Sequence, residues 1–345
     1  MRDSVWTWIH ELDDSLYEKG QADIADKINN FSSMAYAKDQ AGVEAALPEL
    51  LAFARSESSP WLEVYLRHWR LQAYINTETD PQPWINEGLD LLAFAHQDEA
   101  KDCPQRVCVA DDLAALYRAV DGQGFAQARL EMLEEILETL PHSRECLTCI
   151  GYGKIAALCD VERGADAAIF FEDMKQNVPE FSNLVGTHHY NQHLAHEVAR
   201  AYLKSGDLDK AFAELQRFEP TRDMFHSEKD IMMASYHALK GNLDEAKTAF
   251  ERAWSVDKSE INVQRLLEFL HLLLDQDVID GDEVFLQGLV DVLEASFARG
   301  RPGEAFDGTL FILDRFAGSS MGHVLASAKR LQAKCEPLLS HRAML

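Results

Sequence analysis

Two consecutive stretches of the chain carry the same pattern of small and apolar residues on either side of a glycine. The two copies read Ala199-x2-Tyr202-x3-Gly206-Asp207-Leu208-Asp209-Lys210-Ala211-x3-Leu215 and Ala234-x6-Gly241-Asn242-Leu243-Asp244-Glu245-Ala246-x3-Phe250-x2-Ala253. The two glycines lie 35 residues apart, and small residues recur where two helices would have to cross closely. The pattern therefore predicts two successive helix–turn–helix units.

Apolar residues recur at positions i, i+3, i+4 and i+7 along nearly the whole chain, which is the spacing of one face of an α-helix. No alternation of apolar and polar residues bounded by hairpin turns interrupts this spacing, so we expect an all-α fold. Outside the two copies, we expect helices over residues 1–18, 24–37, 42–55, 60–76, 84–95, 107–120, 125–140, 149–160, 165–177, 261–274, 284–298, 302–316 and 320–339.

The turn and the Ala-x3-Leu or Ala-x3-Phe spacing that follows it resemble the tetratricopeptide repeat (TPR), whose period is roughly 34 residues. The resemblance is clear over 192–258, moderate over 104–178 and 284–316, and weak over 1–100. One departure is Lys258, which stands where the family has a proline. The resemblance implies an α-solenoid, a right-handed superhelix of stacked antiparallel helix pairs.

We therefore expect residues 1–345 to form a single continuous TPR-like α-solenoid. Residues 1–100 would supply divergent helices, 101–316 the clearer repeats, and 317–345 a capping helix. Because this fold is a recognition scaffold, the resemblance implies a protein or peptide partner bound along the concave groove.

The charge of the chain limits its partners. It has 33 basic and 58 acidic residues, a formal net charge of −25, and no basic block, which argues against binding to nucleic acid or to an anionic membrane. The longest apolar stretch, Leu266 to Leu274, is broken by Glu268 and His271 and is too short to span a membrane. No secretory signal is visible after Met1, so we expect a cytoplasmic protein with reduced cysteines.

The resemblance places a polar stripe in the predicted groove: His193, His196, Glu197, Arg200 and Lys204. It also places three residues of the next repeat there: Ile231, Met232 and Ser235. We expect the stripe to be locally basic and to bind an acidic or carboxylate-bearing segment, with Arg200 the strongest contact because its planar fork can hold a carboxylate bidentately. The alternative is a partly solvated polar helix face.

A second hypothesis assigns zinc to four residues of the same region: Cys146, Cys149, His189 and His193. Imidazole and thiolate groups suit tetrahedral zinc, but a lone Cys-x2-Cys pair is a weak signal, so we expect no metal or cofactor. We also expect no enzyme, since the sequence has no nucleophile elbow, His-Glu-x-x-His or phosphate-binding loop. A zinc-binding or catalytic protein, and a regulatory subunit that senses a small ligand, are the alternatives to a scaffold.

Tryptophans gather in the first quarter of the chain. Trp6 and Trp8 are two residues apart and cannot share one helix face, so we expect one of them to be exposed. An exposed tryptophan offers a contact for a partner or for a second copy of the chain.

Overall fold

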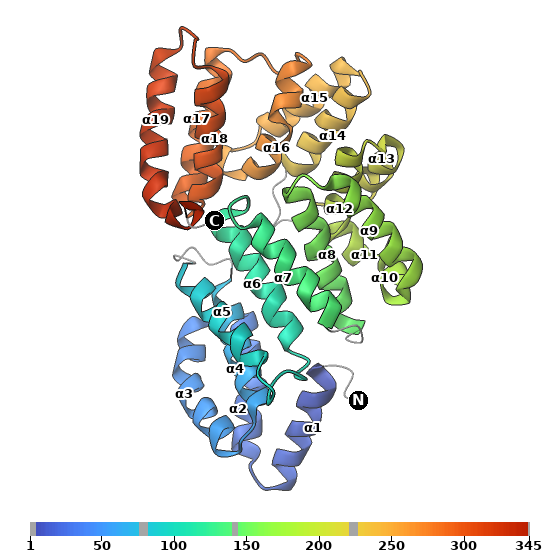
Figure 1. Cartoon of the computed structure of the whole chain (residues 1–345), viewed down its shortest axis with the longest axis vertical. Helices are drawn as coiled ribbons and strands as arrows, with labels where there is room; N and C mark the ends of the chain where they lie inside the picture. Colours follow the sequence, from blue (N-terminus) through green and yellow to red (C-terminus); the bar gives the residue numbers. More distant parts are fainter. Residues whose placement is uncertain (1–4, 76–81, 140–143, 221–226, 344–345) are drawn as a thin grey trace. The chain divides into compact units, whose positions relative to one another are not determined.

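The computed structural model describes residues 5–75, 82–139, 144–220 and 227–343 (Figure 1). Contacts between Cα atoms divide the chain into two compact units. Unit 1 comprises residues 1–119 and 128–153, and unit 2 comprises residues 120–127 and 154–345. A single continuous superhelix over the whole chain stays a prediction.

Unit 1 is built from helices that follow one another along the chain: α1 (Val5–Glu18), α2 (Ala22–Tyr36), α3 (Gln40–Ser56), α4 (Pro60–Tyr74), α5 (Gln82–Ala95), most of α6 (Arg106–Asp121), most of α7 (Ala126–Thr139) and the first part of α8 (Arg144–Asp160). Its core contains Trp8, which is buried and meets Trp61 edge to face at 5.8 Å between ring centroids. Trp6 is 48% exposed, as expected for one member of the pair.

Unit 2 contains the end of α8 and a longer series of helices: α9 (Gly164–Asn177), α10 (Pro179–Leu184), α11 (His188–His193), α12 (Ala195–Ser205), α13 (Leu208–Arg217), α14 (Ser227–Leu239), α15 (Leu243–Trp254), η1 (Lys258–Glu260), α16 (Val263–Asp275), α17 (Glu283–Ala298), α18 (Pro302–Arg315), α19 (Gly322–Cys335) and η2 (Glu336–Ala343). The short helices α10 and α11 were not predicted. The end of α6, the loop that follows it and the start of α7 (residues 120–127) also belong to this unit.

The two repeated turns form as the sequence predicts. Gly206 ends α12 with φ +80°, and Gly241 follows α14 with φ +78°, a left-handed conformation that glycine adopts without strain. The Gly206 N–H donates to Leu203 O at 3.2 Å, and the Gly241 N–H donates to Ala238 O at 3.0 Å. The same turn therefore pairs α12 with α13 and α14 with α15.

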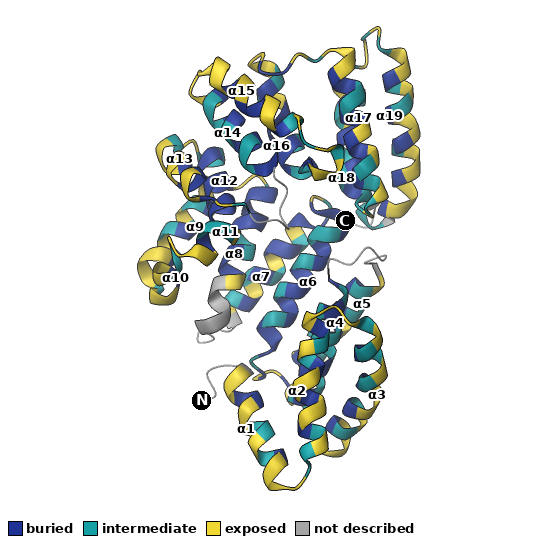
Figure 2. Cartoon of the chain, turned by 180° about the vertical axis from the view of Figure 1, so that it is seen from behind, coloured by how far each residue is buried: buried dark blue, intermediate teal, exposed yellow. Residues whose placement is uncertain are grey.

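Close packing of these pairs builds the core of unit 2. α12 packs against α9, α13 and α14, while α14 also packs against α15 and α16. α12 is buried along almost its whole length (Figure 2). Ala211 and Ala246 are fully buried, which agrees with their predicted place at helix crossings.

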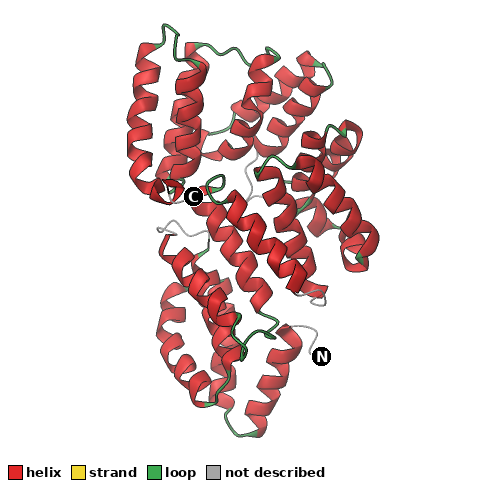
Figure 3. Cartoon of the chain, in the orientation of Figure 1, coloured by secondary structure: helices red, strands yellow, loops and turns green. Residues whose placement is uncertain are grey.

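Helix is the only regular secondary structure in the part of the chain that the structure describes, and adjacent helices pack in pairs (Figure 3). The all-α class and the helix-pair architecture of an α-solenoid are thus confirmed. Among the described helices, none has both the length and the apolar character that crossing a membrane requires.

Candidate binding cavity and its charge network

A buried network of charged side chains joins α8, α12, α14 and α16 in unit 2. At its centre, the Arg200 guanidinium on α12 is fully buried. Its Nε donates to the two carboxylate oxygens of Glu268 at 2.7 and 2.8 Å, and its Nη1 donates to Glu197 at 3.1 Å. Its Nη2 donates to Asp160 at the end of α8. All three guanidinium nitrogens thus bind carboxylates of this chain.

A second buried guanidinium, that of Arg265 on α16, shares two of these carboxylates. It donates to Glu197 at 2.6 Å and to Glu268 at 3.2 Å, and its Nε donates to Glu228 on α14 at 3.0 Å. The Lys204 ammonium lies 2.9 Å from Glu268. Because each of these buried charges has an opposite charge within hydrogen-bond distance, the network can stay ionised inside the unit.

The pKa values follow from this pairing. Burial alone would lower the pKa of Arg200, but the surrounding carboxylates, with Asp160 first, raise it well above its usual value. Burial alone would raise the pKa of Glu268, but Arg200 and Arg265 hold it below its usual value. These groups therefore remain charged at neutral pH.

The structure brings the predicted groove residues together only in part. Three belong to the charge network: Glu197, Arg200 and Lys204. Three others are buried in the packing of α14: Ile231, Met232 and Ser235. Since its nitrogens already bind this chain's own carboxylates, Arg200 has no free fork to offer a partner. The expectation of an accessible basic stripe is corrected accordingly.

The histidines of that stripe do not share one helix. α11 ends at His193 and α12 begins two residues later, because Leu194 departs from helical geometry with φ −123°. His193 is exposed, with its ring 4.9 Å from that of His189, whereas His196 is buried against Phe218. Burial and the neighbouring histidines lower the pKa of His193, which therefore favours its neutral form.

The zinc hypothesis involves Cys146, Cys149, His189 and His193. Cys149 is exposed and forms no disulfide, and Cys146 lies outside the side chains that the structure describes. Among the described side chains, no group of three or more histidine, cysteine, aspartate or glutamate residues is placed to hold a metal ion.

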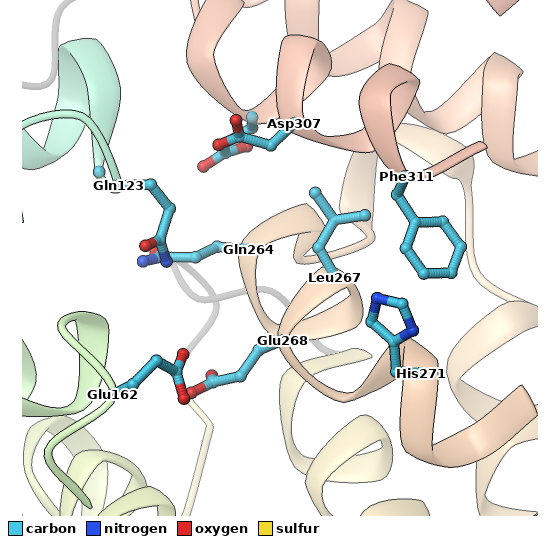
Figure 4. A pocket seen from close by; sticks show the side chains of 10 residues that line it. Gln123, Glu162, Gln264, Leu267, Glu268, His271, Asp307 and Phe311 are labelled. Carbon is cyan, nitrogen blue, oxygen red and sulfur yellow. The ribbon is translucent and has the colours of Figure 1, made fainter. Parts of the chain in front are cut away.

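A cavity of about 560 Å³ opens in unit 2 next to the charge network (Figure 4). Its wall comes from the loop after α6, the turn after α8, α16 and α18. The residues that line it are Gly122, Gln123, Glu162, Gln264, Leu267, Glu268, His271, Glu304, Asp307 and Phe311. Four of these residues are carboxylates, and none of the described lining residues is a lysine or an arginine, so the wall is acidic.

One wall carries Glu268 and Glu162, whose carboxylates point toward each other (Figure 4). Both bind the Lys204 ammonium, which lies 2.8 Å from Glu162. Lys204 can lie this close to α9 because the helix begins with Gly164, where a Cβ atom would collide with the Lys204 side chain. The network behind the cavity thus holds its acidic wall in place.

Glu162 has a backbone conformation that glycine has in other turns of unit 2. Its φ is +61°, and its N–H donates to the carbonyl three residues earlier, as at Gly206 and Gly241. The left-handed region costs a non-glycine residue about 1–2 kcal/mol. Backbone strain of this kind often accompanies a functional side chain, and here the carboxylate is 79% exposed and lines the cavity.

Neutral groups of the wall remain open to a ligand. Among the described residues, the Gln123 amide and the His271 ring have no hydrogen-bond partner. The Gln264 amide nitrogen donates to Asp160 at 3.1 Å, which leaves its carbonyl oxygen as an acceptor. Phe311 meets the His271 ring edge to face at 4.6 Å. Acceptors beside an aromatic ring suit a cation that donates hydrogen bonds.

The wall on α18 carries Glu304 and Asp307. Glu304 accepts hydrogen bonds from Arg301 at 3.0 Å and from Ser296 at 2.8 Å. Asp307 accepts two from Arg342 of η2, at 2.6 and 3.0 Å. Burial nevertheless raises the pKa of Asp307, against the effect of that guanidinium.

Sequence reasoning missed these cavity residues, although one signal was present. Glu268 and His271 interrupt the apolar run of α16, and a charged residue on an otherwise apolar helix is either paired in the core or faces a ligand. Gln123 and Asp307 have no comparable signal because only the tertiary fold brings them to one cavity.

Comparisons of the chain with protein-family models, with curated proteins and with solved structures find no match. The TPR resemblance therefore rests on the repeated turns and small residues quoted above and stays a prediction.

Proposed function

We propose that the chain is a cytoplasmic protein-binding scaffold of the TPR-like kind, and that its cavity receives a lysine or arginine side chain from a basic segment of a partner. The observation that carries the proposal is the acidic wall, with four carboxylates and no lysine or arginine among its described residues. The fold supports it, since stacked helix pairs present side chains of several helices to one bound segment.

Electrostatics favour a cationic ligand at both long and short range. The net charge of −25 attracts basic partners and repels acidic ones before contact. At 4 Å, a pair of unit charges near a protein surface interacts with about 4 kcal/mol at an effective dielectric constant of 20. The geometry thus favours a basic partner segment, whereas the sequence led us to expect an acidic one.

The dimensions and neutral groups of the cavity agree with this ligand class. Its 560 Å³ falls within the roughly 300–1,000 Å³ of ordinary ligand pockets. Gln123 and His271 can complete the hydrogen bonds of an ammonium or guanidinium group, and Phe311 can pack against the aliphatic stem of the same side chain.

The test measures binding of three fluorescent peptides of equal length: one rich in lysine and arginine, one rich in glutamate, and one neutral. We expect the basic peptide to bind best and to lose affinity as salt is added. Glu304→Gln and Glu162→Gln should each weaken its binding by about tenfold or less, which corresponds to about 1.4 kcal/mol or less.

The matched control is Glu251→Gln, which removes an exposed carboxylate of α15 outside the cavity lining and should leave binding unchanged. Preference for the acidic peptide would contradict the proposal and would support the acidic partner segment expected from the sequence. An equal loss in the Glu251 variant would exclude the cavity as the binding site.

Two further outcomes would favour another function. Stoichiometric zinc that is lost when Cys146 and Cys149 are replaced by serine would favour the zinc-binding or catalytic alternative. Tight binding of a small polyamine, with no binding of basic peptides, would favour a regulatory subunit that senses a small cation.

A further inference from the structure

We infer that Asp121 and Asp307 form a guanidinium-binding subsite at the α18 side of the cavity, which Arg342 fills as an internal ligand and which an arginine of the partner fills by exchange. The inference rests on the proposed function, since it assumes that a basic segment enters this cavity. It assigns arginine, rather than lysine, to the part of the cavity that Asp307 lines.

The geometry of the bound guanidinium defines the subsite. Asp121, at the end of α6, accepts hydrogen bonds from Nε and Nη2 of Arg342, both at 2.5 Å. Asp307 on α18 accepts from Nη1 at 2.6 Å and from Nη2 at 3.0 Å. The two carboxylates therefore engage both edges of the planar fork. A single ammonium could not reproduce four such bonds.

Two glycines make room for the Asp121 carboxylate. A Cβ atom at Gly124 or at Gly303 would collide with the carboxylate oxygens of Asp121. The Gly124 N–H instead donates to Asp121 at 3.1 Å. Asp121 is almost completely buried, so its orientation is fixed before a cation binds.

Aromatic rings enclose the same place. The Arg342 guanidinium carbon lies 5.5 Å from the centroid of the Phe306 ring. The neighbouring His341 donates or accepts a hydrogen bond with Asp121 at 2.8 Å and stacks on Phe125 at 4.4 Å. Guanidinium groups stack readily on aromatic faces, so this surrounding suits arginine.

The charges of the subsite leave one carboxylate in excess. Two acidic groups share the single cation of Arg342. Loss of that cation would leave the buried Asp121 with the His341 ring and the Gly124 N–H as its partners, and it would remove the guanidinium that pairs with the half-buried Asp307. An empty subsite would therefore attract a replacement guanidinium strongly.

Arg342 is held in a way that permits exchange. It belongs to η2, a short 3-10 segment in which Leu339 departs from helical geometry, and such segments have weak backbone hydrogen bonding of their own. Its side chain is 23% exposed, whereas that of Arg200 is completely buried between long helices. Asp307 also faces the cavity that the partner segment would enter.

The test is chemical rescue of Arg342→Ala in the full chain. The variant should melt at a lower temperature than the wild type, and N-acetyl-arginine methylamide at about 10 mM should recover most of the loss by binding the vacant carboxylates. The neutral citrulline analogue and the lysine analogue should recover little. Arg330→Ala, which removes an exposed arginine of α19 that donates a hydrogen bond to Ser327 and lies outside the cavity lining, should show no response to the arginine compound.

A second measurement tests exchange with a partner. An arginine-rich peptide should bind Arg342→Ala about tenfold more tightly than the wild type, because the internal competitor is gone. A lysine-rich peptide should gain much less. If Arg342→Ala does not fold, Arg342→Gln replaces it in both measurements.

The outcomes separate this inference from the proposed function. Failure of the arginine compound to rescue, or equal rescue by the citrulline analogue, overturns the subsite even if basic peptides still bind the wild type through Glu304 and Glu162. Rescue without any peptide binding to either form overturns the exchange and the proposed function together. Rescue with a tenfold gain in arginine-peptide affinity supports both.

Discussion

Two buried polar clusters, one in each unit, enclose carboxylates by different means. In unit 2, the carboxylates around Arg200 form ion pairs with guanidinium groups. In unit 1, the partners of Asp112 on α6 are an imidazole and an amide rather than guanidinium groups. The His68 Nε2 atom lies 2.7 Å from one of its oxygens, and the Gln72 amide donates to the other at 3.2 Å.

The difference in partners changes carboxylate pKa values, as Asp111, the residue next to Asp112, illustrates. Among the described residues its carboxylate has no ion pair or hydrogen bond, and burial together with the charge of Asp112 raises the pKa of Asp111 to about 7. Glu268 in unit 2, which faces two guanidinium groups, has its pKa lowered instead. The stability that Glu268 contributes to unit 2 should therefore fall as the pH drops and this carboxylate becomes protonated. The stability of unit 1 should instead fall as the pH rises and Asp111 loses its proton.

The largest effect should come from Arg200→Ala. It leaves the carboxylates of Asp160 and Glu268 buried without their main partner, and breaking a buried pair of this kind destabilises proteins by about 3–5 kcal/mol. Urea unfolding at pH 7 measures the change in free energy of unfolding, and hydrogen exchange in α12 and α16 locates it in unit 2.

The matched control for this variant is Arg252→Ala. Arg252 is 55% exposed and pairs with Asp230 at 2.9 Å, so its loss should cost at most about 1 kcal/mol. Equal stability of the two variants would contradict a structural role for Arg200. It would instead support the ligand-binding role that the sequence predicts for this residue.

This contrast also explains how far the sequence could predict the molecule. Gly206, Gly241 and Ala246 specify turns and helix crossings through local spacing, and the structure has them as predicted. The burial of Arg200 depends on Asp160 and Glu268, which lie 40 and 68 residues away along the chain. Helical register gives the face on which Arg200 lies, but not what packs against that face.

The candidate cavity could not be predicted from the sequence either, because its lining residues are also far apart along the chain. The sequence predicts only a break between the helices over 107–120 and 125–140, yet Gln123 in that break lines the cavity with Asp307 and Glu304 of α18. Glu268 did stand out, as a charge within an apolar run, but the sequence does not say whether such a residue is paired or faces a ligand.

An intermediate effect should come from Asp111→Asn, which tests the unit 1 side of the comparison. The pKa of Asp111 is about 7 in the folded chain and is ordinarily 3.8, so the folded state retains a proton that the unfolded state loses. Wild-type stability therefore falls as pH rises from about 4 to 7 through this group. Asparagine removes that loss, so the variant should gain about 1–3 kcal/mol relative to the wild type at pH 8 and little at pH 4.

Urea unfolding of both proteins at pH 4, 6 and 8 measures the difference. Asp90→Asn, an exposed carboxylate on α5, is the control and should differ from the wild type equally at every pH. A stability difference for Asp111→Asn that does not grow with pH would mean that Asp111 is ionised in the folded chain. The contrast between the two units would then fail.

The smallest effect should come from Glu162→Gly, which separates backbone strain from ligand binding. Unit 1 provides a matched control, because Ser58 has φ +51° in the same type of turn and lies outside the cavity lining. Glycine relieves left-handed strain at both positions, so Ser58→Gly should gain about 1 kcal/mol of stability. Glu162→Gly should gain less, because it also loses the ion pair with Lys204, whose glutamate partner is largely exposed.

Binding should distinguish the two variants more clearly than stability does. If the acidic wall receives a basic segment, Glu162→Gly should weaken binding of the lysine- and arginine-rich peptide by about threefold, while Ser58→Gly should leave it unchanged. Thermal melts and fluorescence anisotropy on the same samples give both quantities. A Glu162→Gly variant that is more stable and binds the peptide with full affinity would mean that the strain at Glu162 has no role in the cavity. The acidic wall would then depend on Glu268, Glu304 and Asp307 alone.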